Sequence, residues 1–558
     1  MADTATLVYA PLGGAGEIGM NMYLYGFGPV KSRRWIMVDC GIGFGDMETS
    51  PGVELIVPDT AFVESLGDRL EAIFITHAHE DHVGAIGRLW RKLNAPVWAT
   101  RFTAEIAKRK MQEEGLSPKA VKIAEYGGRV QAGPFSVEFI PVTHSTLQCS
   151  ALAIRTEKGV ILHTADFKID DDPLVGAPFD IEPFRALGRE GVLAMAIDST
   201  NVFSEGSTGS EGSLRPDIER VIRECEGAVA ATSFASNVVR LKTLAEAAAA
   251  CDRSVVIAGR AMRRMIEAAV DTGLLKDFPP TVPEDRASDI PDRNLFYLLT
   301  GSQGEHRAAL ARVAAGVHPT VSLSEGDTVL FSSRTIPGNE AEIYRLYNRL
   351  SERGVRVIDA DMARIHASGH ACRDELRAIY EAVKPRIALP MHGEHRHLVE
   401  HAASAKRWGA DHAVVAPNGS VVALDGNRPE IVDEVETGRV YLDGSVFVGA
   451  LDGVIRDRLK LARQGHVVIA LVVDEEGDLL ADPEVRCIGA PVDRERPLDA
   501  VIAQAVDDAM DRAGRKEKRT DAGVESVAAR AARKVCFDRW GKKPVTTVIV
   551  TRLEDEED

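Results

Sequence analysis

Three histidines and two carboxylates lie within six consecutive positions, 77–82, of the segment THAHEDH at residues 76–82. Side chains in extended chain alternate in direction, so His77 and His79 point to the same side, while Asp81 and His82 are expected to open a following helix. Imidazole and carboxylate together suit zinc or manganese, and an arrangement that leaves positions for water is typical of a catalytic metal site. The spacing HxHxDH is far more specific than a single histidine.

The elements around this segment are expected to place its ligands where a strand becomes a helix. Residues 72–75 are an apolar run that predicts a buried strand, and residues 83–90 return to the apolar spacing of a helix. Three further ligand-type residues follow apolar runs elsewhere in the chain, namely His144, Asp166 and His392. Because the loops at one edge of a layered sheet gather distant parts of the chain, we expect these three residues to join the cluster.

The composition is that of a globular protein. The chain has 558 residues, 45% of them apolar and 27% charged, and this length predicts about three or four domains. Its net charge of −17 argues against a protein that covers nucleic acid with its whole surface, because such binding relies on Lys and Arg. The cysteines stand singly without a CxxC pair, and neither an N-terminal signal nor an apolar run of about 18 residues is present. We therefore expect a cytoplasmic protein that makes no membrane contact.

The order of the apolar runs predicts one layered α/β domain that is interrupted by another. Short β-rich runs with glycine turns dominate residues 1–210, whereas the helix and strand alternation of a parallel sheet dominates residues 211–362. The histidine loop after RIALP indicates that the chain returns to the first domain in residues 363–435. A glycine-bearing linker at residues 436–463 then leads to a small C-terminal α/β domain at residues 464–558.

These motifs together resemble a known superfamily. THAHEDH, the isolated His144 and the TADF segment around Asp166 are similar to the metallo-β-lactamase hydrolases. More narrowly, DSTN at residues 198–201, HASGH at residues 366–370 and PMHGEHRHL at residues 390–398 resemble the β-CASP nucleases. The segments PLGGAGEIGMNMYLY, SFASN and TGRVYLDG extend the similarity to one group of bacterial β-CASP ribonucleases over almost the full chain. The resemblance implies a metallo-β-lactamase αββα sandwich with an inserted β-CASP parallel-sheet domain and a small C-terminal α/β domain.

The resemblance also implies two divalent metal ions per chain, with zinc as the expected metal and manganese as the alternative. The ligands would be His77, His79 and His144 for one ion, Asp81, His82 and His392 for the other, and Asp166 bridging both. Two cations about 3.5 to 4 Å apart can polarise one phosphoryl oxygen and activate water at neutral pH. The motifs of the inserted cassette fall on Asp198, His370 and His392. His370 would donate a proton to the leaving 3′ oxygen or brace the oxyanion, and Asp198 would hold a ligand histidine.

A phosphate pocket is implied beside the metals. Small residues and backbone N–H groups where a strand turns into a helix suit a terminal phosphate. The pocket would hold the 5′ monophosphate of RNA between the SFASN loop and the HASGH loop, with Phe234 stacking on a base. Its residues would be Phe234, Ser236, Asn237, His366, Ala367, Ser368, Gly369 and His370. The chain would then be a 5′-to-3′ exonuclease and endonuclease on single-stranded RNA, active in mRNA decay and rRNA maturation.

Alternatives to this interpretation stay open at the level of sequence. The HxHxDH core alone also suits a small-molecule hydrolase such as a lactonase or thioesterase, because a metal scaffold does not name its substrate. A metal-dependent DNA nuclease shares the backbone chemistry, and only a 2′-OH contact would distinguish RNA. A non-catalytic RNA-binding component is a further class, although all seven expected ligands are present. We expect a homodimer or homotetramer, with partners among other RNA-decay proteins.

Overall fold

The computed structural model describes residues 5–336, 338–491 and 494–553, so the outer ends of the first and last expected domains lie outside it. The chain forms two compact units, one from Met1–Gly43 with Val57–Arg439 and one from Phe44–Ile56 with Val440–Asp558. The first unit contains both the layered domain and the insertion. The boundaries of the five expected segments stay a prediction.

Two sheets form the layered domain. Their strand orders are β25-β24-β1-β3-β4-β7-β8-β9 and β10-β11-β12-β13-β14-β21-β23. The first contains β1 (Thr6–Gly13), β3 (Met22–Gly28), β4 (Arg34–Val38), β7 (Leu70–Ile75), β8 (Val97–Ala99), β9 (Val121–Ile123), β24 (Ser420–Ala423) and β25 (Glu430–Glu434). The second contains β10 (Arg129–Ala132), β11 (Phe135–Val142), β12 (Cys149–Thr156), β13 (Gly159–His163), β14 (Val192–Asp198), β21 (Ile387–Met391) and β23 (His412–Ala413).

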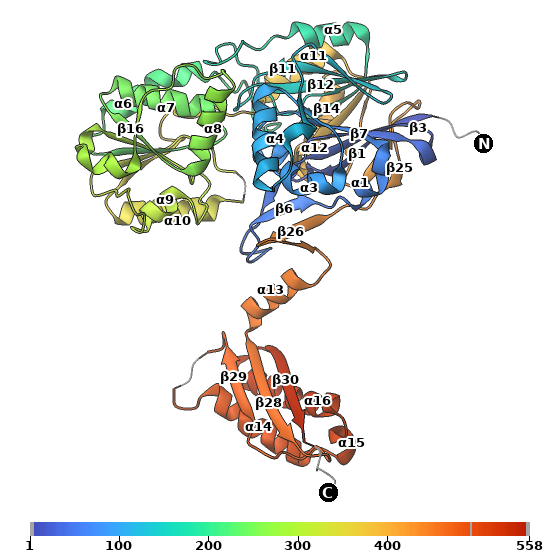
Figure 1. The fold of residues 1–558 in the computed structure, drawn as a ribbon, viewed down its shortest axis with the longest axis vertical. Coiled ribbons are helices and arrows are strands. Elements are labelled where there is room, and N and C mark those ends of the chain that lie inside the picture. The colour runs from blue at the N-terminus through green and yellow to red at the C-terminus, as the bar shows by residue number, and fades with distance from the viewer. Residues whose placement is uncertain (1–4, 337, 492–493, 554–558) are drawn as a thin grey trace. The chain divides into compact units, whose positions relative to one another are not determined.

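The core of this domain lies between the two sheets and under the helices outside them. Buried side chains of both sheets meet in one cluster, in which the rings of Phe74 and Phe139 are 6.0 Å apart. Helices on the outer side of the first sheet are α1 (Ala61–Leu66), α3 (Ile86–Leu93) and α4 (Arg101–Glu113). A second cluster packs the other sheet against α5 (Glu182–Glu190), α11 (Arg373–Val383) and α12 (His395–Arg407). The αββα sandwich is thereby confirmed (Figure 1).

The insertion is a separate parallel sheet with helices around it (Figure 1). Its strand order is β17-β16-β18-β15-β19-β20, and its strands pair in parallel. The strands are β15 (Val229–Thr232), β16 (Ser254–Ala258), β17 (Thr281–Val282), β18 (Leu295–Leu299), β19 (Thr328–Phe331) and β20 (Arg356–Ile358). The helices are α6 (Arg215–Arg223), α7 (Val238–Ala250), α8 (Arg260–Asp271), α9 (Ala309–Ala314) and α10 (Glu340–Glu352). The expected inserted parallel-sheet domain is therefore present.

The second unit contains the small C-terminal α/β domain. A hairpin of β26 (Arg439–Asp443) and β27 (Val446–Gly449) and helix α13 (Val454–Gln464) precede it. Strand β28 (His466–Val473) pairs antiparallel with β29 (Glu484–Ile488) and parallel with β30 (Val545–Arg552). The sheet packs on α14 (Leu498–Arg512) and α16 (Asp521–Trp540) through one apolar cluster. Within the described residues, every helix is too short or too polar to cross a lipid bilayer.

The direction of the strands determines where the site forms. β13, β14 and β21 run parallel, and β11 has the same direction because both it and β13 pair antiparallel with β12. Their C-terminal ends therefore share one edge of the second sheet. In the first sheet β4 and β7 are parallel as well. Loops that follow these strands gather at one end of the sandwich, as is usual for sites of α/β proteins.

Candidate metal centre

The seven residues expected to bind metal all lie at this end of the sandwich. His77 and His79 follow β7, and Asp81 and His82 lie in α2 (Glu80–Val83). The remaining ligands, His144, Asp166 and His392, follow the ends of β11, β13 and β21. Their side chains form two overlapping groups: His77, His79, His144 and Asp166, and Asp81, His82, Asp166 and His392. Within each group, the possible ligand atoms lie within 4.8 Å of one another, and Asp166 belongs to both.

The donor set fits divalent cations. Nδ1 of His79 lies 3.1 Å from Nε2 of His77 and 3.0 Å from Nε2 of His144, so three ring nitrogens converge on one point. Oδ1 of Asp166 is buried and has no hydrogen-bond partner in the described part of the chain. Because a buried acceptor without a partner is costly, this oxygen is available for a cation. The residues shown here therefore support divalent metal binding.

The three histidines of the first group are neutral imidazoles. Burial, together with the neighbouring histidines, holds the pKa of His77 and of His144 well below the ordinary value. Burial also lowers the pKa of His79 to about 4. Neutral imidazoles keep a lone pair for a metal at neutral pH. Burial alone would raise the pKa of Asp166, but the nearby histidines outweigh it and keep this carboxyl ionised.

The second group combines two carboxylates with two basic imidazoles. Burial alone would lower the pKa of His82, but three carboxylates, of which Asp166 acts most strongly, raise it well above the ordinary value. In the same way, Asp166 opposes burial and raises the pKa of His392 to about 10. Both imidazoles must lose a proton to become ligands, so metal binding in this group releases protons.

Asp39 was not singled out from the sequence, although it orients a metal ligand. Its Oδ2 accepts a hydrogen bond from Nδ1 of His82 at 2.7 Å, which leaves Nε2 of His82 facing Asp166 at 3.1 Å. The backbone N–H of Thr76 in turn donates to Asp39 Oδ1 at 2.8 Å. Carboxylates that hold a ligand histidine in this way fix its tautomer and ring direction. The sequence does carry a signal for this residue, because Asp39 directly follows the apolar strand β4.

His370 and Asp198 form a pair beside the second group. Oδ2 of Asp198 accepts from Nδ1 of His370 at 2.8 Å, and its Oδ1 lies 3.4 Å from Nδ1 of His392. Burial alone would lower the pKa of His370, but the Asp198 carboxylate outweighs burial and raises it. The side chain of His370 remains 22% exposed. A partly accessible imidazole, with a pKa that Asp198 raises, thus lies next to the expected metal ligands.

The HASGH loop is hydrogen-bonded directly to an expected metal ligand. The carbonyl of Gly369 accepts a hydrogen bond from Nδ1 of His144 at 2.5 Å. This contact directs Nε2 of His144 toward the other ligands. A Cβ atom at residue 369 would lie 2.6 Å from Cε1 of His144, so the close approach requires glycine. The HASGH loop and the first group of expected ligands are therefore held together by direct contact.

The buried Arg240 joins the HASGH loop to the inserted domain. Its Nε and NH2 donate to the two carboxylate oxygens of Glu211 at 3.0 and 2.7 Å. Its guanidinium also donates to the carbonyls of Ser332, Ile365 and Ala367 at 3.0, 3.2 and 3.3 Å. Neither Arg240 nor Glu211 was expected from the sequence, because pairing between distant segments leaves no local pattern.

The structure also brings the SFASN segment to this loop. Ser233 donates to the carbonyl of Ser332 at 3.1 Å, and Ser332 donates to the carbonyl of Ile365 at 2.6 Å. Phe234 and Ser236 are partly exposed. Asn237 is buried and caps helix α7, where its Oδ1 accepts from the N–H of Arg240 at 2.9 Å. The side-chain oxygen of Asn237 is thus used in the helix cap, and only its side-chain NH₂ group remains to bind a ligand.

The remaining loop residues are partly buried. Nδ1 of His366 lies 3.2 Å from NH1 of Arg240, and burial with this neighbouring charge holds the pKa of His366 well below the ordinary value. Ala367 is buried, and its carbonyl faces Arg240. Oγ of Ser368 accepts from Nδ2 of Asn201 at 2.9 Å. The loop is therefore held by hydrogen bonds on both sides.

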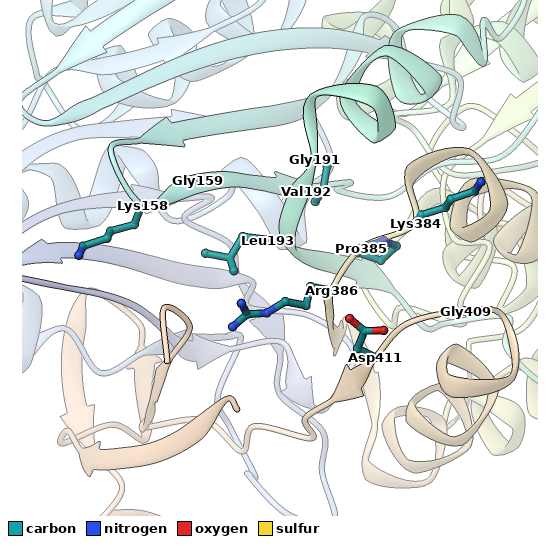
Figure 2. A pocket seen from close by; sticks show the side chains of 10 residues that line it. All are labelled: Lys158, Gly159, Gly191, Val192, Leu193, Lys384, Pro385, Arg386, Gly409 and Asp411. Atoms are coloured by element: carbon teal, nitrogen blue, oxygen red, sulfur yellow. The ribbon is translucent and has the colours of Figure 1, made fainter. Parts of the chain in front are cut away.

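A separate cavity of about 500 Å³ opens at the opposite ends of the strands (Figure 2). It is lined at the start of β13, β14 and β21 by residues that include Lys158, Leu193, Arg386 and Asp411. None of the expected metal ligands lines it. The cavity and the expected metal ligands therefore lie at opposite ends of these strands.

Comparison with known families covers most of the chain. Residues 16–222 match the metallo-beta-lactamase superfamily, and residues 226–350 match the family described as "Ribonuclease J, beta-CASP domain". Residues 340–416 match the "Zn-dependent metallo-hydrolase RNA specificity domain". Residues 453–553 match the "Ribonuclease J C-terminal domain".

Whole-chain relatives show the same pattern. A protein named Ribonuclease J from Sinorhizobium meliloti is 42% identical over 99% of this chain and 98% of its own length. Ribonuclease J 1 from Streptococcus pyogenes is 34% identical over 97% of this chain and 96% of its own length. Among solved structures, a protein of unknown function from Enterococcus faecalis aligns with a TM-score of 0.50 at 16% identity, over 75% of this chain and all of that one. This last likeness concerns the fold alone.

Proposed function

The chain belongs to the ribonuclease J family of metal-dependent ribonucleases, and on that basis we propose that it degrades single-stranded RNA from a 5′-monophosphate end and also cuts RNA internally. One observation carries the proposal. The HASGH loop provides both His370 of the metal centre and the residues beside the SFASN segment, so a bound 5′ end would lie next to the ligands. The proposed setting is mRNA decay and rRNA maturation.

The proposed metal complement is two divalent ions per chain, with zinc before manganese. The proposed ligands are His77, His79, Asp81, His82, His144, Asp166 and His392. When bound, the ions supply Lewis-acid polarisation of the phosphodiester and lower the pKa of the attacking water. Nitrogen ligands in the first group favour zinc, and the carboxylates of the second group also suit manganese.

His370 is the proposed proton donor. Attack of water on the phosphorus breaks the bond to the 3′ oxygen, and the departing alkoxide needs a proton. The Asp198 carboxylate raises the pKa of His370, which favours the protonated imidazole that this role needs, and it fixes the direction of the ring through Nδ1. The remaining ring nitrogen, Nε2, would deliver the proton to the 3′ oxygen. General acids of this kind contribute about 10² to 10⁴ in rate.

Cleavage of the bond to the 3′ oxygen would also let the protein act repeatedly from the 5′ end of one RNA. When the bond to the 3′ oxygen breaks, the phosphate stays on the shortened RNA and renews its 5′ monophosphate. The SFASN and HASGH loops would hold this group through Ser236, the amide of Asn237 and backbone N–H groups, while Phe234 stacks on the base. A triphosphate adds bulk and negative charge that such a pocket rejects. Each turnover would therefore release one mononucleotide.

The test uses one RNA sequence with a 5′ monophosphate, triphosphate or hydroxyl, labelled at either end. We expect rapid release of mononucleotides from the monophosphorylated RNA, slow terminal degradation of the other two, and no cleavage in a chelator. Mononucleotides that arise from the 3′ end, or equal consumption of the three RNAs, would contradict the proposed direction. A DNA strand of the same sequence tests the rival DNA nuclease. The homodimer or homotetramer, the decay partners and the cytoplasmic location stay predictions.

A further inference from the structure

Phe203 is an exposed aromatic side chain next to the DSTN segment, residues 198–201. It belongs to the turn at residues 200–203, which includes the last two residues of DSTN and follows the end of β14. Half of its surface is exposed, although apolar side chains of this size contribute most when buried. A single exposed aromatic is ordinary on protein surfaces, but the neighbours of Phe203 set it apart.

Two basic side chains of helix α12 contact the ring of Phe203. Cζ of Arg396 lies 5.7 Å from the ring centroid, in cation–π range, and the ring of His397 lies 5.3 Å away at an angle of 59°. Arg396 is 65% exposed, and its Nε donates to Glu394 at 3.0 Å. His397 is buried, and its ring packs against that of Phe203 at a tilt. The guanidinium of Arg396 thus lies over the ring, while half of the Phe203 surface stays open to solvent.

The turn that carries Phe203 is fixed to the metal centre. Oγ1 of Thr200 lies 2.9 Å from Nδ1 of His392, and Nδ2 of Asn201 donates to the carbonyl of His370 at 2.8 Å. On its other side, Arg373 donates to the carbonyl of Val202 at 2.9 Å. Three peptide units separate Phe203 from Thr200, so their Cα atoms are at most about 11 Å apart. The ring is therefore rigidly placed within a short distance of the ligands.

Helix α12 is held against the same turn by a close approach. It begins three residues after His392, and a Cβ atom on the intervening Gly393 would lie 2.9 Å from Cβ of His397 and 3.3 Å from Cβ of Ser199. The first turn of the helix, the DSTN segment and the ligand loop are thus packed together. The position of Arg396 relative to Phe203 follows from this packing.

We propose that Phe203 and Arg396 form a stacking site for a nucleobase of the RNA chain next to the scissile phosphate. The inference rests on the proposed function and extends it, since neither residue belongs to the metal centre or to the 5′-phosphate pocket. An aromatic face accepts any base, and the guanidinium of Arg396 can pair with the phosphate of the stacked nucleotide. The site would hold the RNA chain in line with the metals without reading its sequence. This suits a protein of net charge −17, in which RNA contacts must be local.

The test compares Phe203→Ala, Phe203→Trp and the matched control Tyr344→Ala, which removes an exposed aromatic from α10. For a single-stranded 5′-monophosphorylated RNA, we expect Phe203→Ala to raise KM by about 5- to 100-fold, from the usual contribution of one stacked base. Phe203→Trp should restore the wild-type KM, and kcat should change little. Hydrolysis of bis(p-nitrophenyl) phosphate, which carries no base, should stay unchanged in all variants.

Arg396→Gln gives a second readout. Removing one phosphate contact should make the affinity for RNA less sensitive to salt, lowering the slope of the log–log plot by about 0.7 for a single strand. An RNA with abasic positions after the first nucleotide should bind wild type and Phe203→Ala equally. If the wild-type protein does not cleave RNA, the proposed function fails. If it cleaves RNA and Phe203→Ala leaves KM unchanged, only the stacking site is overturned.

Discussion

Nδ1 of His370 lies 2.8 Å from Oδ2 of Asp198, although the two residues are 172 positions apart in the chain. This contact joins the end of β14 to the HASGH loop and orients one imidazole toward the metal ligands. It also raises the pKa of His370 against the effect of burial. In the proposed mechanism, this carboxylate sets the direction of the imidazole that donates the proton.

Replacing His370 should slow cleavage without emptying the metal centre. We expect His370→Ala to reduce kcat on RNA by about 10² to 10⁴, the range for loss of a general acid. The metal content of the purified protein, measured by mass spectrometry, should stay at the wild-type value. Loss of metal on this substitution would mean that His370 is itself a ligand, which its place near Asp166 and His392 also permits.

Arg240 should control the recognition of the 5′ end. Arg240→Met removes the hydrogen bonds to the Ile365 and Ala367 carbonyls and leaves Glu211 buried without its partner, at a cost of about 3 to 5 kcal/mol. We expect a lower melting temperature and a smaller preference for 5′-monophosphorylated over 5′-hydroxylated RNA. Arg349→Met on the exposed side of α10 is the control. An unchanged preference in a folded Arg240→Met variant would separate this arginine from the pocket.

A negative charge in the HASGH loop should oppose a bound phosphate. Ser368→Glu places a carboxylate where Oγ of Ser368 now accepts from Asn201, and like charges repel. We expect the preference for a 5′ monophosphate to disappear, while internal cutting is affected less. Ser368→Gln, which has similar size without the charge, should keep most of the preference. Equal effects of the two substitutions would point to steric disruption instead.

The buried ion pair of Lys168 and Asp170 should contribute stability that depends on pH. Nζ of Lys168 lies 2.8 Å from Oδ2 of Asp170, and neither side chain is exposed. Burial alone would raise the pKa of Asp170, but Lys168 lowers it below the ordinary value of 3.8. A depressed carboxyl pKa stabilises the fold above the unfolded-state value, and this contribution is lost as the pH falls through the folded-state pKa.

Asp170→Asn should therefore lower the melting temperature at pH 7 by on the order of 5 to 10 °C, because it leaves a buried charge unpaired. Scanning calorimetry over a pH series should show a constant difference from wild type at pH 5 to 7 that narrows only below about pH 4. A difference that grows as the pH falls would contradict the direction of this pKa shift.

The sequence predicted those parts of the site whose residues are close together or follow apolar strands. THAHEDH concentrates four expected ligands in one loop, and His144, Asp166 and His392 each follow a strand that periodicity could identify. Asp39 has the same signal but was missed, because a lone carboxylate after a strand is common in proteins.

Contacts between distant segments left no such signal. Glu211 and Arg240 pair within the inserted domain, and Asn237, which the sequence suggests only as a pocket residue, uses its side-chain oxygen to cap helix α7. Residues 44–56 belong to the second unit, although their neighbours on both sides belong to the first. These relationships depend on three-dimensional packing, which local periodicity does not contain.

The proposed two-metal centre is tested most directly by removing two ligands of the second group. We expect Asp81→Ala with His82→Ala to lower the metal content from two ions per chain and to abolish RNA cleavage, while RNA binding largely survives. His395 is an exposed histidine on α12, and the control His395→Ala should change neither the metal content nor the rate of RNA cleavage. The decisive measurement is the turnover of 5′-monophosphorylated RNA by the folded double variant, with its metal content determined on the same sample. Turnover below detection supports the account, and turnover at the wild-type rate would contradict it.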